Sequence, residues 1–350
     1  MEYKNEVFAP TVAHYPGDAE ASLRALKPLE DAGYQIGLMV FTQEGMKSVT
    51  DPGIIAKQYA NLEGVAGEYG DSSLVCMLSE VPIGEMDHYS NTKVALNHVL
   101  RGIDFARGIP IGRTGRRKIT FHLNSLVRRE EFTGRTQADW MNKFDFCISP
   151  SLKEIGKYAS DKGVQALVET TPVPEFGDEG PEMNNPEKHF YLGRKRSELV
   201  NPFHIFKGSH VERAIRDAGL GICLDICHSR TIYLEARHNN TSVLFDRDIK
   251  LIKGTLGNLI DDVGGLWDEI DLVHLNDGDG RYTPEGGVFR EGVALGKGEL
   301  SADGSMPQIV RTLNSKRVPF VLEINERFDD IKAGRRPETD ASVEYLLAHS

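Results

Sequence analysis

Cysteine is scarce in this chain, and the few residues present form no recognisable framework. Among 350 residues there are four cysteines, Cys76, Cys147, Cys223 and Cys227, and no two of them are spaced as a Cys-x-x-Cys pair. A small secreted domain that is held together by disulfides has a far denser set of cysteines. We therefore expect four reduced thiols, and we exclude a structural zinc site built from paired cysteines.

Long apolar runs are also absent. No stretch approaches the roughly 20 consecutive apolar residues that a helix needs to cross a bilayer. The first residues, Met1–Glu6, are charged, and the apolar segment of a signal peptide does not follow them. We expect a cytoplasmic protein that has no membrane partner.

Basic residues are outnumbered by acidic ones. The chain has 41 lysines and arginines against 52 aspartates and glutamates, which gives a formal net charge of -11. Proteins that bind duplex DNA usually present a basic face, because binding depends on releasing counterions from the phosphates. The charge therefore favours a small-molecule substrate over a nucleic-acid partner.

Short apolar runs, by contrast, recur along the whole chain and alternate with longer amphipathic stretches. Each run is mostly apolar, as expected for a parallel strand that is buried on both faces. The eight runs are Val7–Val12, Gln35–Phe41, Ser73–Leu78, Lys118–Leu123, Gln165–Thr170, Gly221–Ile226, Asp271–Leu275 and Pro319–Ile324.

The stretches between these runs have helical patterns, clearest in Asn91–Gly108, His210–Ala218 and Ser305–Leu313. Eight strands with intervening helices predict an α/β fold, a closed (β/α)8 or TIM barrel that spans residues 1–350 as a single domain. The alternative is an open doubly wound sheet. That fold usually has a glycine-rich turn after its first strand, and residues 9–12 contain no glycine.

Two segments, Pro172–Lys207 and Gly278–Leu295, are longer than ordinary connections. Both follow strands, so we expect both loops at the C-terminal face of the barrel, where active sites are built. Long loops in this position often act as lids. For the first loop, surface decoration or an oligomer contact is an equal alternative.

Ionisable residues end the last four runs, and they form the candidate site. Glu169, Asp225, His274 and Glu323 each follow about three apolar residues, at the point where a strand leaves the core. A lone acidic residue at a strand end is usually solvated, but four consecutive strands repeat the pattern here. Three carboxylates that converge on one mouth would repel each other unless a cation neutralises them. This donor set predicts one divalent metal, Mn²⁺, Mg²⁺, Co²⁺ or Zn²⁺.

A family resemblance follows from the order of these motifs. The motifs are Val168-Glu169-Thr170, Leu224-Asp225-Ile226-Cys227-His228, Val273-His274-Leu275-Asn276-Asp277, Leu295-Gly296-Lys297-Gly298-Glu299-Leu300 and Leu322-Glu323. The chain resembles the xylose isomerase-like, or AP endonuclease family 2, superfamily of TIM barrels. That superfamily includes endonuclease IV, ketose 3-epimerases, hydroxypyruvate isomerase and inosose dehydratase. The first half of the chain matches in layout only.

The resemblance implies roles for individual residues. It implies that Glu169, Asp225, His274 and Glu323 bind the metal, that Glu169 and Glu323 also transfer protons on opposite faces of the substrate, and that His228 holds a substrate oxygen. A chelated carbonyl acidifies the neighbouring C–H bond, so the reaction would pass through an enediolate. The resulting expectation is a metal-dependent isomerase or epimerase of carbohydrate metabolism, acting on a keto-sugar, a sugar phosphate or a related hydroxy-carbonyl compound.

A nuclease of the endonuclease IV type is less well supported. Its larger metal cluster needs a histidine on the third strand and an Asp-x-His pair before the Gly-x-Gly element. The third run has no histidine, and Arg290 and Gly292 occupy the places of that pair. His228 would be left as the one remaining ligand of a further metal, and a single imidazole does not hold one.

A dehydratase remains the main alternative, because the same metal site would serve it. His122, at the end of the fourth run, could protonate a leaving hydroxyl group, or it could simply support the metal ligands. Asp277 could touch substrate hydroxyls or orient His274. Lys297, Arg281 and the cluster 194–196 could bind a substrate phosphate. An inert barrel that serves as a binding subunit, and a homo-oligomer of this chain, also stay open.

Overall fold

Eight parallel strands form a closed barrel, which confirms the predicted fold and rules out the open sheet. The computed structural model describes residues 3–41, 47–66, 74–78, 89–110, 117–123, 127–173, 190–191, 194–195, 199–256, 269–280 and 289–350. The barrel strands are β1 (Glu6–Thr11), β2 (Gln35–Phe41), β3 (Leu74–Leu78), β4 (Arg117–His122), β6 (Val164–Glu169), β10 (Gly221–Asp225), β11 (Leu272–Leu275) and β14 (Phe320–Leu322).

The first strand closes the barrel. Val7 of β1 lies opposite Ile36 of β2 on one side and Phe320 of β14 on the other. Around the ring each barrel strand pairs with the barrel strands that precede and follow it in the chain. All carboxyl ends of the strands therefore point to one mouth, where a parallel barrel collects its functional residues.

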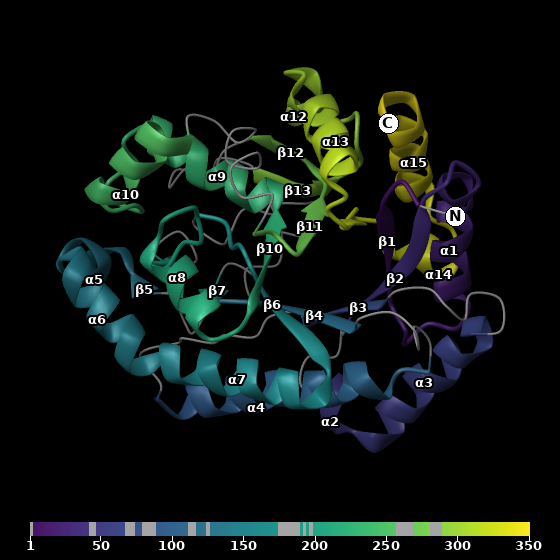
Figure 1. Ribbon diagram of the computed structural model, residues 1–350, viewed down its shortest axis with the longest axis horizontal. Coiled ribbons are helices and arrows are strands. Elements are labelled where there is room, and N and C mark those ends of the chain that lie inside the picture. Colours follow the sequence, from purple (N-terminus) through teal and green to yellow (C-terminus); the bar gives the residue numbers. More distant parts are fainter. Residues whose placement is uncertain are drawn as a thin grey trace.

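Helices surround the strands (Figure 1). Helix α1 packs on β1 and β2, α4 on β3 and β4, and α7 on β6. The described helices are α1 (Asp18–Asp31), α2 (Lys47–Thr50), α3 (Pro52–Ala66), α4 (Tyr89–Gly108), α5 (Arg129–Thr133), α6 (Gln137–Cys147), α7 (Ser149–Lys162), α8 (His210–Asp217), α9 (Ile226–Arg237), α10 (Asp246–Leu251), the π-helical turn Ile252–Leu256, α12 (Glu299–Ala302), α13 (Ser305–Lys316), α14 (Phe328–Lys332) and α15 (Pro337–His349).

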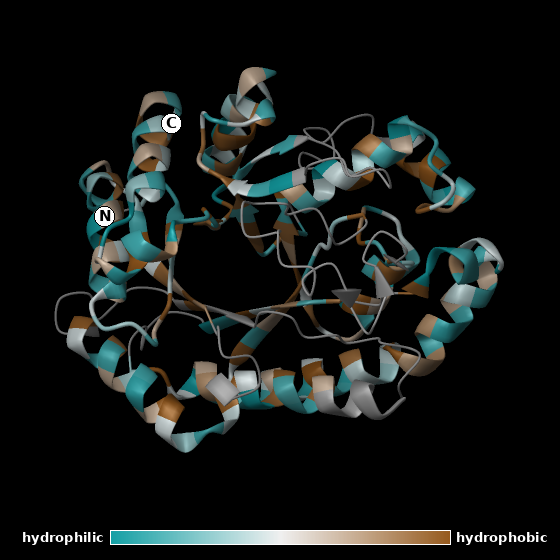
Figure 2. Ribbon diagram, turned by 180° about the vertical axis from the view of Figure 1, so that it is seen from behind, coloured by the Kyte–Doolittle hydropathy of each residue, from teal (hydrophilic) through white to brown (hydrophobic). Residues whose placement is uncertain are grey.

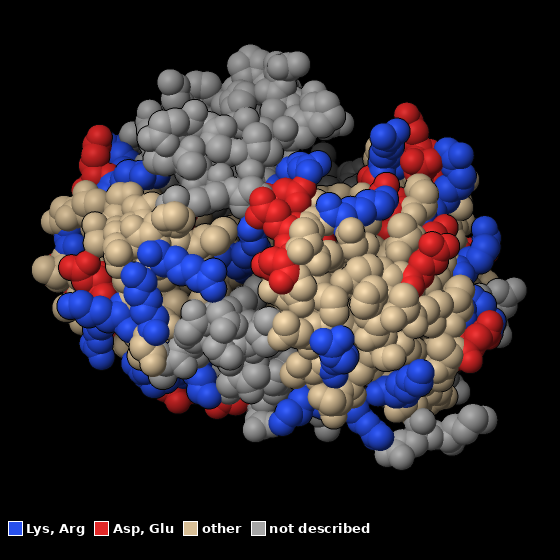
Figure 3. All heavy atoms as spheres, turned by 90° about the horizontal axis from the view of Figure 1, so that it is seen from above, with Lys and Arg blue, Asp and Glu red and all other residues tan. Residues whose placement is uncertain are grey.

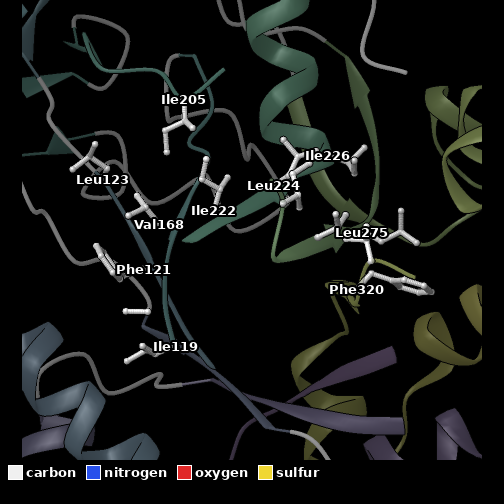
Figure 4. Packing of buried hydrophobic residues seen from close by; sticks show 14 of the residues in the cluster. Ile119, Phe121, Leu123, Val168, Ile205, Ile222, Leu224, Ile226, Leu275 and Phe320 are labelled. Atoms are coloured by element: carbon white, nitrogen blue, oxygen red, sulfur yellow. The ribbon is translucent and has the colours of Figure 1, made fainter. Parts of the chain in front are cut away.

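Alternate residues of each strand face opposite sides of the barrel wall. One set fills the interior of the barrel: Phe8, Met39, Val75, Leu167, Cys223, Leu272 and Val321. The other set points outward to the helices, and it includes Ile119, Phe121, Val168, Ile222 and Phe320 (Figure 4). The strands at the centre are accordingly mostly hydrophobic, while the helices carry residues of both kinds (Figure 2). This two-sided burial is the reason for the continuous apolar runs in the sequence.

The two long segments are described in part. From the first come the short strands β7 (Phe190–Tyr191), β8 (Arg194–Lys195) and β9 (Leu199–Val200), and β9 pairs with β5 (Val127–Arg128). The second contains an antiparallel pair, β12 (Asp277–Gly280) and β13 (Phe289–Val293). Residues 174–189, 192–193, 196–198 and 281–288 lie outside the described residues. Whether either loop acts as a lid stays a prediction.

Charge and cysteine content agree with the fold. The face in Figure 3 carries Lys and Arg side chains beside Asp and Glu, so the negative net charge does not make this face uniformly acidic. Cys147, Cys223 and Cys227 are free thiols, while Cys76 lies on β3, where the side chain is outside the described set. Among the described helices, none has both the length and the apolar character of a membrane span.

Candidate metal centre

Four side chains from four neighbouring strands meet at the mouth of the barrel. Glu169 ends β6, Asp225 ends β10, His274 lies in β11 and Glu323 follows β14. One ligand atom from each lies within 4.8 Å of the others. Glu169, Asp225 and His274 are fully buried, while the Glu323 side chain is 19% exposed. The structure thus brings together all four residues that the sequence proposes as metal ligands.

The two-residue period of a strand explains the convergence. Each ligand lies two residues after a side chain of the barrel interior: Leu167, Cys223, Leu272 and Val321. Residues i and i+2 of a strand point to the same side of the sheet. The four candidate ligands therefore form the next layer above the apolar interior, facing the axis of the barrel.

Close contacts join three of the four residues. The Nδ1 atom of His274 lies 3.1 Å from Oε1 of Glu169 and 2.9 Å from Oε2 of Glu323. Asp225 is held separately, because its Oδ1 accepts a hydrogen bond from the backbone N–H of His228 at 2.7 Å and so caps helix α9. Its Oδ2 accepts a hydrogen bond from Nδ2 of Asn276 at 3.0 Å. Asn276 therefore orients a ligand of the proposed metal.

The pKa values show how strongly these charges depend on one another. Burial by itself would raise the pKa of Glu169, but the imidazoles of His122 and His274 outweigh it and hold this pKa well below its ordinary value. Burial and the carboxylates of Glu323 and Glu169 raise the pKa of Asp225 to about 7, against the opposing effect of His228. The pKa of His274 is raised well above its ordinary value, because Cys223, Glu169 and Glu323 overcome the effect of burial. The cluster therefore needs positive charge at its centre, and a metal ion would supply it in place of protons.

The donor atoms themselves fit a metal. Oε2 of Glu169 and Nε2 of His274 are buried, and neither atom has a hydrogen-bond partner in the part of the chain that the structure describes. Leaving buried polar atoms unsatisfied costs roughly 1–3 kcal/mol each, and more for a charged group. Coordination of a cation would satisfy them. Three carboxylates and one imidazole suit a hard or borderline divalent ion.

Two further histidines lie beside Glu169. The Nε2 atom of His122, which ends β4, is 3.0 Å from Oε1 of Glu169, and the His122 side chain is 15% exposed. The Nδ1 atom of His228, in the first turn of α9, is 3.7 Å from the same oxygen and 3.7 Å from Oδ1 of Asp225. The two rings meet edge to face with centroids 5.7 Å apart. Both predicted substrate-binding histidines thus border the candidate metal centre.

Asp277 has a different environment from the one that the sequence suggests. Its carboxylate is fully buried and accepts hydrogen bonds from the backbone N–H groups of Gly278, Gly298 and Leu300, each at 3.0 Å. A Cβ atom on Gly298 would lie 2.5 Å from this carboxylate. Asp277 therefore secures the Gly-x-Gly turn against β12, while its contact with substrate stays a prediction.

Lys297 is also engaged elsewhere. Its ammonium group lies 2.5 Å from Oε2 of Glu338 in α15, and its side chain is 51% exposed. This contact is a surface ion pair, and binding of a substrate phosphate by Lys297 stays a prediction. Of the other proposed phosphate-binding residues, Arg194 and Lys195 form strand β8, while Arg196 and Arg281 lie outside the described residues.

Glu291 is the neighbour of the site that the sequence does not reveal. It lies on β13, and its Oε2 is 2.8 Å from Nε2 of His228. In the Asp-x-His motif of endonuclease IV, the middle position has no assigned role. Glu291 occupies that position, between Arg290 and Gly292, so the motif gave no reason to single it out. The sequence shows an acidic residue in the glycine-rich segment, but no local pattern predicts that its partner is His228.

Comparisons with known proteins identify the fold. No protein-family model matches the chain, and no curated protein matches it. Among solved structures it is similar to a D-tagatose 3-epimerase-like protein, at 14% identity and a TM-score of 0.53, over 99% of this chain and 96% of the other. It is similar to an L-ribulose 3-epimerase, at 13% identity and a TM-score of 0.50, over 98% and 93%. A xylose isomerase domain-containing protein from Salmonella typhimurium LT2 matches at 14% identity and a TM-score of 0.50, over 99% and 98%. The chain thus shares a TIM-barrel fold with these structures, in agreement with the fold that the sequence predicts.

Proposed function

We propose that this chain is a metal-dependent isomerase or epimerase that acts on a keto-sugar, a sugar phosphate or a related hydroxy-carbonyl compound. The observation that carries the proposal is the convergence of Glu169, Asp225, His274 and Glu323 within 4.8 Å at the mouth of the barrel. Two structural neighbours, although distant in sequence, are named as sugar 3-epimerases or like one. The proposed substrate is a small molecule; cytoplasmic location, a homo-oligomeric state and the absence of a nucleic-acid partner stay predictions.

A divalent ion held by these four residues would polarise a carbonyl and an adjacent hydroxyl oxygen and so make the neighbouring C–H bond more acidic. Glu323 is the accessible carboxylate of the set, so we assign to it the removal of the proton from one face of that carbon. Glu169 would deliver a proton to the opposite face, and it must first receive that proton, which His122 at 3.0 Å or His274 at 3.1 Å is close enough to supply. A carboxylate base in such a position contributes roughly 10²–10⁴-fold to the rate.

One observation keeps a dehydratase as the second candidate. His122 lies 3.0 Å from Glu169 and is part-exposed at the edge of the site. A ring in this place could protonate a hydroxyl group that leaves the carbon next to the one that Glu169 or Glu323 deprotonates. The substrate would then be a polyol or keto-inositol type of compound, and the reaction would release one water molecule.

Solvent-hydrogen exchange tests the proposal. The purified chain, loaded in turn with Mn²⁺, Mg²⁺, Co²⁺ or Zn²⁺, is incubated in D₂O with a panel of ketoses, ketose phosphates and keto-inositols, and the products are analysed by NMR and mass spectrometry. Deuterium beside a carbonyl group together with a new sugar supports the isomerase or epimerase, and loss of water supports the dehydratase. Neither change with any compound, in protein that has bound one metal ion, would count against an enzyme and in favour of a binding barrel.

A further inference from the structure

Glu291 makes a contact that the proposed reaction does not yet use. Strand β13 carries it above helix α9, where its Oε2 lies 2.8 Å from Nε2 of His228. The two residues are 63 positions apart in the sequence. The Glu291 side chain is 39% exposed, whereas that of His228 is 7% exposed. Glu291 therefore covers the one ring edge of His228 that faces away from the buried cluster.

The other ring nitrogen of His228 fixes the position of its proton. Nδ1 lies 2.7 Å from the backbone carbonyl oxygen of Thr170. A carbonyl oxygen only accepts hydrogen bonds, so Nδ1 carries a hydrogen and donates it there. The same nitrogen is 3.7 Å from Glu169 and from Asp225, too far for a hydrogen bond to either. Nε2 is left to interact with Glu291, and a hydrogen bond of 2.8 Å to a carboxylate requires a proton between the two atoms.

The backbone at Glu291 is itself held in place by Asn325, in the segment that follows β14. Asn325, two residues after Glu323, donates its Nδ2 hydrogen to the carbonyl of Glu291 at 2.9 Å and its backbone N–H to the carbonyl of Gly292 at 2.8 Å. Gly292 has a φ of 66°, and a Cβ atom there would lie 2.4 Å from Nδ2 of Asn325. Only glycine fits this close approach without strain. Asn325 thus fixes the backbone of β13, and the side chain of Glu291 reaches His228 from it.

From this geometry we infer that Glu291 is a positioning residue for the proposed reaction: it fixes the orientation of the His228 ring at the edge of the candidate metal centre, and a substrate oxygen that enters there would share the hydrogen on Nε2 with the Glu291 carboxylate. The inference rests on the proposed function for its kinetic consequence. Its structural part, the hydrogen bond between Glu291 and His228, holds or fails without any substrate.

The structural part is tested by NMR of the Mg²⁺-loaded protein labelled with [¹⁵N]histidine. We expect a downfield Nε2–H resonance in the wild type, and its loss in His228→Asn assigns it to His228. The resonance should be lost or broadened in Glu291→Ala. Glu299→Gln is the matched control, because Glu299 pairs with Arg230, two residues beyond His228 on α9, and lies at the surface. An unchanged resonance in Glu291→Ala would overturn the inference. So would a second bound metal ion that Glu291→Ala removes, because Glu291 would then be a ligand.

The kinetic part uses the substrate that the exchange experiment identifies. We expect Glu291→Ala to lower kcat by about 10–100-fold with little change in KM or in metal affinity, as for other groups that orient site residues. Glu291→Gln should recover part of this loss, since its side-chain oxygen still accepts from Nε2–H. Wild-type kcat in Glu291→Ala would overturn the role in the reaction. If no compound reacts with the wild type, the proposed function fails while the NMR result still decides whether Glu291 holds His228.

Discussion

The imidazole of His274 lies between two carboxylates, with Nδ1 2.9 Å from Oε2 of Glu323 and 3.1 Å from Oε1 of Glu169. These two acids come from β14 and β6, which are separated in the barrel by β10 and β11. The ring therefore links the two carboxylates to which we assign proton transfer. A metal bound by all three residues would replace the proton that their charges otherwise require.

Metal removal should destabilise the protein measurably. We expect one divalent ion per chain by calorimetric titration, and metal at about 100 times its Kd should raise the free energy of unfolding by about 2.7 kcal/mol. Asp225→Asn should weaken metal binding and lessen this stabilisation, because the amide still caps α9 but lacks the charge. Glu338→Gln, at the surface pair with Lys297, is the control. Equal metal affinity in Asp225→Asn and wild type would show that the cluster is not the metal site.

Loss of the Glu323 carboxylate should abolish most activity and leave the fold intact. Glu323→Gln removes both a ligand and the proposed base, so we expect kcat to fall by roughly 10²–10⁴-fold. Circular dichroism and the thermal midpoint of the metal-free protein should resemble those of the wild type. Asp329→Asn, on the exposed side of α14, serves as the comparison. Turnover at the wild-type rate in Glu323→Gln would mean that the base lies elsewhere.

Asp277→Ala should affect stability more than substrate binding. The substitution leaves three backbone N–H groups without their acceptor, two of them in the Gly-x-Gly turn and the start of α12. Unsatisfied buried groups cost roughly 1–3 kcal/mol each, so chemical denaturation should show a loss of at least about 2 kcal/mol. Below the unfolding transition, KM should stay near the wild-type value. A large rise in KM with unchanged stability would return Asp277 to the role of a substrate ligand.

The buried ring of His204 should make stability depend on pH. Burial lowers the pKa of His204 to about 4 from an ordinary value of 6.5, so the unfolded chain takes up a proton more readily than the native one. Above pH 6.5 the ring is neutral in both states and does not change the free energy of unfolding. As the pH falls from 6.5 toward 4, protonation of the unfolded chain lowers the free energy of unfolding by no more than about 3 kcal/mol. Urea titrations across this range should show a shallower pH dependence for His204→Asn than for wild type. A slope in His204→Asn equal to that of the wild type would contradict the prediction.

Much of the fold could be predicted from local sequence pattern. All eight predicted runs coincide with barrel strands to within a residue or two at their ends, and the helices at 91–108, 210–218 and 305–313 form as expected. A strand buried on both faces is apolar throughout, and this signal survives without knowledge of its neighbours. The four candidate ligands follow from the same pattern, because parallel strands bring the residues at their carboxyl ends to one mouth.

The partners of the loop residues were decided only by the tertiary structure. Asp277 looks like a free polar group in the sequence, yet the turn at Gly298 folds back onto it, and Lys297 finds Glu338 on the last helix. Glu291 reaches His228 because Asn325, after β14, holds the backbone of β13 at Glu291 and Gly292. Strand periodicity sets the side of the sheet to which each side chain points, so the sequence determined which four candidate ligands would face the axis of the barrel. Contacts between distant loops depend on where the closed barrel brings them, so the sequence alone left them open.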